Sequence, residues 1–233
     1  TADELDKLFS EACEELKDFG LDKYSFEWGL LARLLLSILV DADRWDSACF
    51  EYDADPFETP QDAQPDWEKL LTELDTYLEK LPKEGELAKT RRDISEWCRA
   101  AGEFGPGVYT LSVPTGGGKT YASLRFALAQ AKENQQQRIF YVIPMNTILD
   151  QNSKDIRDAL AGYSSILEHH SNVIHEDEAD ENNYRRLTER WDSNIILTSL
   201  VQYLDALFQS GNSKARRMHC LANSVLIFDE VQA

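Results

Sequence analysis

The sequence contains few cysteines and histidines, and it has no long apolar run. Its four cysteines lie far apart and form no CxxC pair, which argues against a zinc ribbon and against a disulfide framework. We therefore expect reduced thiols and a cytoplasmic location. The longest apolar stretch, Leu30 to Val40, has 11 residues and is interrupted by two polar ones, so it is too short to span a bilayer. No signal-peptide pattern opens the chain, and we expect no membrane partner.

Basic residues are also scarce. The chain has 24 lysines and arginines against 42 aspartates and glutamates, and its formal net charge is -18. The first hundred residues hold 26 of the acidic residues and 12 of the basic ones. A chain this acidic is not held to nucleic acid by its overall field. Any contact with DNA must therefore come from local basic groups or from parts of the protein outside this sequence.

The composition is otherwise that of a globular protein of one or two domains, with 233 residues, 42% of them hydrophobic. We expect helices and a linker over residues 1–60, connecting helices over 61–104, and a third region over 105–233. Prolines and acidic residues over 51–66 mark the linker. A helix is expected from Phe26 to Arg44, and because it is apolar on nearly all sides it needs surrounding partners. We therefore expect the N-terminal part of a larger helical domain to lie outside this sequence.

Strand and helix patterns alternate from residue 108 onward. The expected strands cover residues 108–113, 138–143, 165–168, 194–198 and 224–228. The expected helices cover residues 120–132, 147–160, 184–191 and 200–209, and two amphipathic helices, 67–81 and 88–101, precede them. Short apolar strands separated by helices predict a parallel sheet with right-handed crossovers. The expected fold class is therefore α/β.

A glycine-rich segment lies between the first expected strand and the helix that follows it. Its residues are Thr115, Gly116, Gly117, Gly118, Lys119 and Thr120. Three glycines permit backbone angles that place N–H groups around phosphate oxygens, and the following helix points its positive end at the same anion. We expect Lys119 to contact the β- and γ-phosphates of ATP and Thr120 to ligate Mg²⁺. The general phosphate-loop pattern has glycine where this chain has Val113, so the loop is a variant.

The last expected strand, residues 224–228, is followed by Asp229 and Glu230. A buried strand beside the phosphate loop would bring Asp229 to the magnesium ion, directly or through water, and Glu230 would orient and polarise the attacking water. Either acid alone is weak evidence, because strands often end in aspartate. Together with Lys119, they predict an ATP-hydrolysing site in which Lys119 and Glu230 are the catalytic residues.

At these residues the chain resembles superfamily 2 DExD/H-box helicases. Residues 113–120 resemble motif I, and residues 229–232 resemble motif II in a DEVQ form. Residues 141–147 lie where motif Ia lies, and residues 198–202 where motif Ib lies. The resemblance implies a RecA-like lobe of the P-loop NTPase class.

In that superfamily, motifs Ia and Ib contact the nucleic-acid backbone. The resemblance therefore implies DNA contacts by Asn146, Thr147 and Thr198, because such residues at helix N-termini suit phosphate contacts without base reading. From the sequence alone, Asn146 and Thr147 are equally compatible with a helix cap.

A closer resemblance is to the CRISPR-associated helicase–nuclease of type I systems, particularly its subtype I-C form. It covers most of the chain and is highly specific from residue 108 onward, where residues 111–127, 167–172, 194–202 and 223–232 carry it. This resemblance implies that residues 1–60 are the end of an HD-type nuclease domain. Residues 105–233 then form most of the first RecA-like lobe.

The HD domain of that family cuts single-stranded DNA with divalent transition metals held by several histidines and aspartates. Residues 37–43 (SILVDAD) resemble its last metal-binding helix, and we assign its aspartate to Asp43, with Asp41 as second choice. No histidine precedes His169, so the other ligands are missing from this chain, and one carboxylate makes no tight site. Asp43 is also compatible with an ordinary helix-end acid.

The resemblance implies an activity for the intact protein. ATP would drive translocation on single-stranded DNA in the 3′ to 5′ direction, coupled to degradation of the strand, with recruitment by a guide-RNA surveillance complex. Because the sequence ends just after motif II, we expect the second RecA-like lobe to lie outside it and this chain alone to turn over little ATP. Two alternatives stay open: another superfamily 2 DNA or RNA helicase, and a non-catalytic fragment that binds a partner.

Two groups of polar residues have both structural and functional interpretations. His169 and His170 are adjacent on an expected strand and point to opposite faces, so they cannot easily share a metal ion. The arginine pairs 185–186 and 216–217 suit DNA phosphates, but solvated helix faces are the favoured interpretation.

Further upstream, Arg91 and Arg92 lie where helicases often recognise adenine, although the matching residue is undecided. Trp67 and Trp97 occur at helical spacing with leucines. We expect them to anchor the core rather than to stack on bases.

Overall fold

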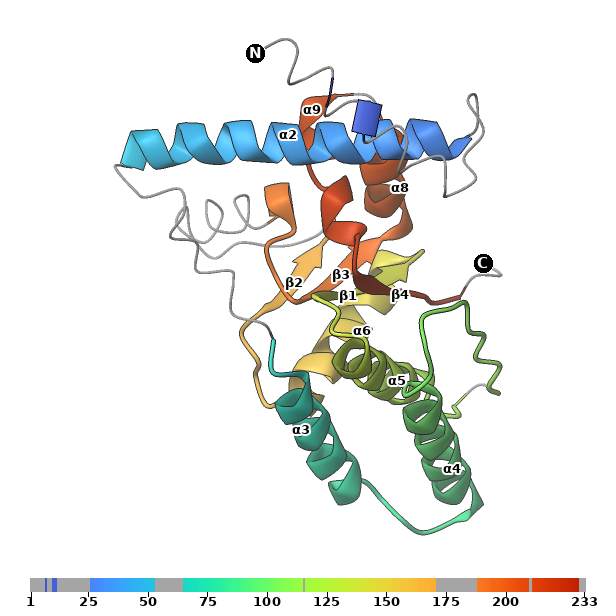
Figure 1. The fold of residues 1–233 in the computed structure, drawn as a ribbon. Helices are drawn as coiled ribbons and strands as arrows, with labels where there is room; N and C mark the ends of the chain where they lie inside the picture. Colours follow the sequence, from blue (N-terminus) through green and yellow to red (C-terminus); the bar gives the residue numbers. More distant parts are fainter. Residues whose placement is uncertain are drawn as a thin grey trace.

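The computed structural model describes residues 7, 10–11, 26–52, 65–114, 116–170, 188–209 and 211–230. Its elements are α2 (Phe26–Tyr52), α3 (Trp67–Lys80), α4 (Glu86–Ala101), α5 (Lys119–Glu133), β1 (Arg138–Ile143), α6 (Asn146–Ala159), β2 (Ile166–His169), β3 (Ile195–Ser199), α8 (Leu200–Phe208), α9 (Asn212–Ala215), the 3-10 helix η2 (Met218–Leu221) and β4 (Ser224–Phe228). Helices cover both faces of one sheet (Figure 1). The expected α/β class is confirmed.

The sheet has four parallel strands in the order β2-β3-β1-β4. Ile139 of β1 lies opposite Ile195 of β3 and Val225 of β4, while Ile166 of β2 lies opposite Ile195. The carboxyl ends of parallel strands meet at one edge of a sheet, where such folds place their ligands. Residues that follow β1, β2 and β4 are therefore brought to the same edge.

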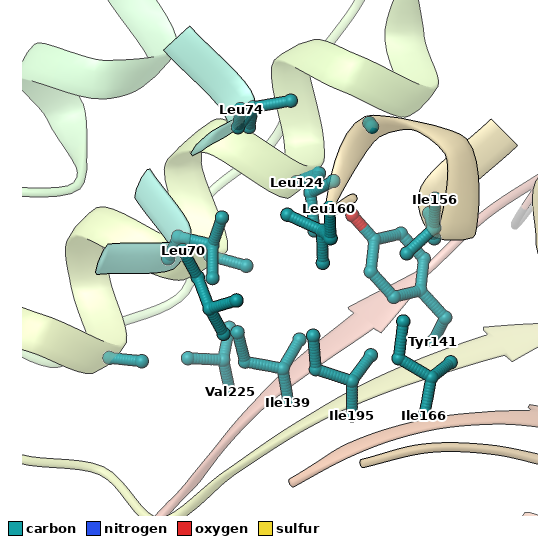
Figure 2. Close-up of a cluster of buried hydrophobic side chains, with 14 of the residues drawn as sticks. Leu70, Leu74, Leu124, Ile139, Tyr141, Ile156, Leu160, Ile166, Ile195 and Val225 are labelled. Atoms are coloured by element: carbon teal, nitrogen blue, oxygen red, sulfur yellow. The ribbon is translucent and has the colours of Figure 1, made fainter. Parts of the chain in front are cut away.

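One face of the sheet packs against α3, α5 and α6 through apolar side chains. Figure 2 shows Val225, Ile139, Ile195 and Ile166 in a row across the four strands, facing these helices. The helical side chains that meet them are fully or almost fully buried: Leu70, Leu74, Leu124, Leu128, Ile156 and Leu160. This layer fixes α5 and α6, which supply residues of the carboxyl edge on this face.

The opposite face has a smaller core. Phe140, Leu167 and Ile196 point to this face because side chains alternate along a strand. They pack with Trp191, whose ring meets Phe140 edge-on at 5.2 Å between centroids. The helix α8 and the 3-10 helix η2 complete this layer.

A buried arginine joins α5 to α3 and α4. The Arg125 guanidinium pairs with Asp75 at 2.9 Å and with Glu96 at 3.0 Å, and it donates to the Ser95 hydroxyl at 3.2 Å. Arg99 also pairs with Asp75. Because two helices supply carboxylates to one cation, this contact sets the spacing of the helices that precede the phosphate loop.

The helix α2 is longer than the expected 26–44 and lies across α8, α9 and η2 (Figure 1). Arg33 donates to the carbonyls of Ala206 and Gln209 at the end of α8, at 3.1 and 2.6 Å. The Ser37 hydroxyl donates to the Arg216 carbonyl at 3.0 Å. These contacts place a cation and a hydroxyl against helix-terminal carbonyls, which lack partners within their own helix.

The other side of α2 is not covered by the residues that the structure describes. Leu35, Leu36, Ile38 and Leu39 are between 44% and 68% exposed. Among the described residues, α8, α9 and η2 approach this helix from one side only. The further partners that its apolar side needs, which we expect to lie outside this sequence, stay a prediction.

The expected strand 108–113 is absent, and this prediction was wrong. The segment has no regular secondary structure and pairs with no described strand, and Val108 is 99% exposed. Tyr109 instead packs on Phe126 of α5, at 5.1 Å between ring centroids, and its hydroxyl bonds to the Gly105 carbonyl. Strand-forming residues need a ladder partner, and the described residues supply none for this segment.

Three cysteines are buried free thiols: Cys49, Cys98 and Cys220. Burial raises the pKa of the Cys98 thiol, and it raises that of Cys220 to about 11. Protonated thiols of this kind are inert.

Among the described helices, none has the length and apolar character that crossing a bilayer requires. Of the expected helix 184–191, only residues 188–191 lie in the described part.

Candidate functional site

The glycine-rich loop has the backbone that three consecutive glycines allow. Gly116 and Gly118 have φ values of +80° and +81°, in the left-handed region that disfavours side chains. At Gly117 a Cβ would lie 2.2 Å from Val113 Cγ1 and 2.9 Å from the Pro114 carbonyl oxygen. Each glycine is therefore needed for the loop to turn into α5. Thr115 lies outside the described residues.

Lys119, the first residue of α5, faces both acids that follow β4. Its ammonium group donates to the Glu230 carboxylate, and it lies 3.8 Å from Asp229 Oδ1. The hydrogen bond that Lys119 donates to Glu230 raises the pKa of the lysine, partial burial lowers it, and the nearby Asp229 charge raises it further. The lysine is thus held protonated beside two carboxylates.

Thr120 and Asp229 are connected through a third side chain. The Thr120 hydroxyl donates to Asn152 Oδ1 at 3.2 Å, and Asn152 Nδ2 donates to Asp229 Oδ2 at 3.4 Å. The structure therefore brings together the hydroxyl and the carboxylate that the sequence places at a magnesium site.

Asn152 was missed in the sequence analysis. It lies on α6 and is 6% exposed, one turn from Leu149 and one turn from Ile156, which are both fully buried. The signal that could have identified Asn152 is its position, because a polar residue in the apolar stripe of an amphipathic helix is unusual.

The strand end itself is held in place. The Asp229 amide donates to the Val142 carbonyl at 3.1 Å, and the Glu230 amide donates to Asp229 Oδ1 at 3.0 Å. Glu230 has a φ of +51°, which is unusual for a residue with a side chain. The left-handed turn at Glu230 directs its carboxylate back toward Lys119.

Of the two upstream arginines, Arg91 reaches the loop. Its Nε donates to the Gly116 carbonyl at 2.7 Å, and its side-chain carbons lie over Gly118. Arg92 instead lies 3.4 Å from the Lys83 carbonyl, away from the loop. The structure thus separates two residues between which the sequence could not choose.

The two aspartates assigned to the HD-type helix differ in environment. Asp41 is 7% exposed and pairs with Arg216 at 2.6 Å and with Arg190 at 3.0 Å. Asp43 is exposed, and no cluster of metal-ligating groups surrounds it among the described residues. Asp41 is therefore a structural ion-pair residue, and the metal role of Asp43 stays a prediction.

Of the three residues expected to contact DNA, the structure describes the side chain of one. Asn146 and Thr147 begin α6, and their side chains lie outside what the structure describes. Thr198 is fully buried, and its hydroxyl donates to the His169 carbonyl at 3.1 Å. The prediction that the Thr198 side chain contacts DNA is therefore wrong, because its hydroxyl donates to a carbonyl inside the sheet.

Two interpretations of the arginines and tryptophans need correction. Arg216 and Arg217 are 6% and 8% exposed, so they form neither a solvated face nor an open phosphate contact. Arg217 bonds to Gln202 at 3.2 Å. Trp67 is buried as expected, but Trp97 is 71% exposed and is not a core anchor. Arg185 and Arg186 lie outside the described residues.

His169 and His170 point to opposite sides, as the alternation predicts. His169 accepts a hydrogen bond from Trp191 Nε1 at 2.9 Å, and burial lowers its pKa to about 3, with the Arg217 charge acting in the same direction. His170 Nε2 faces Asp150 and Glu168 on the α6 side of the sheet. The two histidines therefore cannot share an ion.

Known proteins match the region that contains this site. The family model of the type III restriction enzyme, res subunit, matches residues 87–231. The CRISPR-associated nuclease/helicase Cas3 of Haloferax volcanii is 25% identical over 162 residues, which are 60% of this chain and 17% of that protein. The crystal structure of T. fusca Cas3-AMPPNP has a TM-score of 0.51 and 22% identity, and the match covers 70% of this chain and 19% of that one.

These matches confirm the resemblance to the CRISPR-associated helicases of superfamily 2 and the RecA-like fold of the lobe. The chain spans less than a fifth of the length of either relative. The domain boundaries after residues 60 and 104 stay predictions.

Proposed function

Because the chain belongs to the family of the type III restriction enzyme res subunit, we propose that its α/β region is the ATP-binding lobe of a superfamily 2 helicase. One observation carries this proposal: Lys119 faces Asp229 and Glu230 at the edge of the sheet, where the phosphate loop turns into α5. The T. fusca Cas3-AMPPNP structure, which shares this fold, supports a nucleotide at this edge.

The side chains at this edge suit a magnesium ion. Thr120 and Asp229 offer a hydroxyl and a carboxylate, and Asn152 links them through its amide. Hard oxygen donors are the ligands that Mg²⁺ prefers. We propose that Thr120 and Asp229 hold the ion, which supplies charge neutralisation on the phosphates when it is bound.

The Lys119–Glu230 contact is proposed to exchange when nucleotide binds. Lys119 is protonated and begins α5 directly after the loop, so its ammonium group can move from the Glu230 carboxylate to phosphate oxygens. Glu230 is then released, and its carboxylate is available to orient water for attack. Lys119 and the loop amides bind and position, whereas Glu230 acts in hydrolysis.

In the intact protein, we propose that ATP hydrolysis drives movement along single-stranded DNA in the 3′ to 5′ direction. Asn146 and Thr147, at the start of α6, are the proposed backbone contacts. The proposal extends to an HD-type nuclease that uses Asp43 and divalent transition metals, recruited by a guide-RNA surveillance complex. The support for this part is the sequence resemblance and the name of the Haloferax relative.

The lysine tests the nucleotide site directly. Lys119→Ala should weaken binding of Mg²⁺–ATP to the chain by about 30-fold or more, because a charge-assisted phosphate contact is lost. Isothermal titration measures this. Lys132→Ala, at the other end of the same helix and paired with Glu68 on the surface, is the matched control and should bind as the unmodified chain does. Equal binding by both variants would remove Lys119 from the site.

The variant Glu230→Gln tests the proposed exchange of Lys119 from Glu230 to phosphate. Glu230→Gln removes the charge that competes with phosphate for Lys119, so ATP binding should stay equal or tighten while hydrolysis by the intact protein is lost. A loss of ATP affinity in this variant would show that Glu230 holds the nucleotide rather than the water.

A further inference from the structure

A second group of ligand atoms lies at the same edge of the sheet, beyond β3 from the phosphate loop. Asp150 of α6, Glu168 of β2 and His170, the residue after β2, place one ligand atom each within 4.8 Å of one another. It is the one such group of three histidine, cysteine or acidic residues that the described part of the chain contains.

The distances within the group are close to those of a metal site. His170 Nε2 lies 3.3 Å from Asp150 Oδ1 and 3.8 Å from Glu168 Oε2. Two ligand atoms that each lie about 2.1 Å from one ion are about 3 to 3.5 Å apart. The two carboxylate ligand atoms lie within 4.8 Å of each other, so a side-chain rotation of Asp150, which is exposed, would bring all three ligands onto one ion.

Two features hold the ligands in place. The His170 side chain is 2% exposed, so its ring is confined by packing, while Asp150 is 57% exposed and leaves the group open to solvent. Arg157 donates from Nε and Nη2 to Glu168 Oε1, at 3.1 and 3.0 Å. The arginine thus fixes the glutamate through one oxygen and leaves the other facing His170, which is the arrangement by which outer groups orient metal ligands.

The charges favour a cation. Two carboxylates face one permanent positive charge, Arg157, so the group is negative overall when His170 is neutral. An imidazole nitrogen with two carboxylates suits ions such as Mn²⁺ and Zn²⁺ better than Mg²⁺, which takes oxygen ligands. Three protein ligands leave further positions for water.

We propose that Asp150, Glu168 and His170 bind one divalent transition-metal ion. This site is separate from the expected HD-type site, which lies on α2, and from the proposed magnesium site at Thr120 and Asp229. The same atoms would otherwise form a metal-free ion pair between His170 and Asp150, and the experiment distinguishes the two.

Binding of Mn²⁺ alone, with excess Mg²⁺ and without nucleotide, tests the proposal. The free-ion electron paramagnetic resonance signal should show one Mn²⁺ bound per chain, and added Zn²⁺ should displace it. His170→Asn and Glu168→Gln should each weaken binding at least 10-fold. Asp158→Asn, on the same helix but outside the group, and Asp229→Asn, at the magnesium site, should bind Mn²⁺ as the unmodified chain does.

A second measurement covers changes in folding. Without metal, circular dichroism and thermal unfolding should show that His170→Asn is folded, and Mn²⁺ should raise the melting temperature of the unmodified chain but not of this variant. Loss of binding in Asp229→Asn alone would place the ion at the phosphate loop. Binding that no variant weakens would be adventitious. Either result overturns the proposal without affecting the proposed nucleotide site, which ATP binding reports.

Discussion

The helices that pack on the sheet and the helix α2, which lies outside them, are held by different kinds of contact. Toward α3, α5 and α6 the contact is apolar, and Leu124, Leu128 and Ile139 are fully buried. On the other face, α2 is attached outside α8 and η2 by polar contacts, above all those of Arg33 and Asp41. The phosphate loop and Asn152 belong to the helices of the first face.

This difference predicts how the stability of each part responds to substitution. Apolar packing is non-directional, so a core substitution weakens the structure in proportion to the volume that it removes. A buried ion pair behaves otherwise, because removing one partner leaves an uncompensated charge in a poorly solvated place. The helices that position the nucleotide site should therefore be stable as one unit with the sheet, whereas α2 depends on a few charged groups.

The largest expected effect comes from Asp41→Ala. This change leaves Arg216 and Arg190 buried without their shared carboxylate, and breaking a buried pair in this way costs about 3–5 kcal/mol. Because Asp41 lies on α2, the loss should be concentrated there. Amide hydrogen exchange should show α2 opening more readily while the amides of β1 keep their protection.

Asp43→Ala is the matched control for Asp41→Ala. It removes an exposed carboxylate two positions along the same helix, and the stability should stay within about 0.5 kcal/mol. If Asp41→Ala lowered the protection of β1 as much as that of α2, then α2 and the sheet would unfold together. The contrast between them would then be wrong.

Leu128→Ala tests the apolar face. Leu128 of α5 is fully buried in the main core, and truncation of such a leucine costs about 2–5 kcal/mol, of which we expect about 3. The change should lower the free energy of unfolding of the whole sheet, as measured by urea denaturation. Leu87→Ala, at a leucine that is 53% exposed on α4, should have little effect. A loss confined to α5 would contradict the view that this face unfolds as one unit.

Local patterns in the sequence predicted much of the fold and the centre of the site. The apolar runs at 138–143 and 224–228 became β1 and β4 with those bounds, because short buried strands have a strong composition signal. The phosphate loop was visible because three glycines before Lys119 are rare without a reason in the backbone. The two acids after β4 were visible for their spacing from that loop.

Contacts between residues far apart in the sequence could not be predicted from local patterns. Asp41 meets Arg216 across 175 positions, and no local pattern reports that pairing. The strand expected at 108–113 failed for the same reason, since Tyr109 contacts α5 and no described strand forms a ladder with the segment. Periodicity indicates which residues are apolar, but it does not choose the element that they pack against.

The smallest effect that we expect concerns acid stability, and it also separates the two faces. His169 lies on the α8 side, where burial lowers its pKa to about 3 and where it accepts a hydrogen bond from Trp191. In the unfolded chain a histidine has a pKa of about 6.5. Below that value the unfolded state takes up a proton that the folded state does not, so the free energy of unfolding falls as the pH drops from 6.5 toward 3.

Between pH 7 and pH 5 this loss should be about 2 kcal/mol, measured by urea denaturation at both values. His169→Gln keeps an acceptor for Trp191 but cannot titrate, so its stability should fall by about 2 kcal/mol less over the same interval. Tyr141, a buried titratable group of the opposite face, has a pKa raised by burial and stays neutral throughout the acid range. An equal loss in both proteins would mean that His169 takes up its proton in the folded state, and the acid sensitivity would then belong to another group.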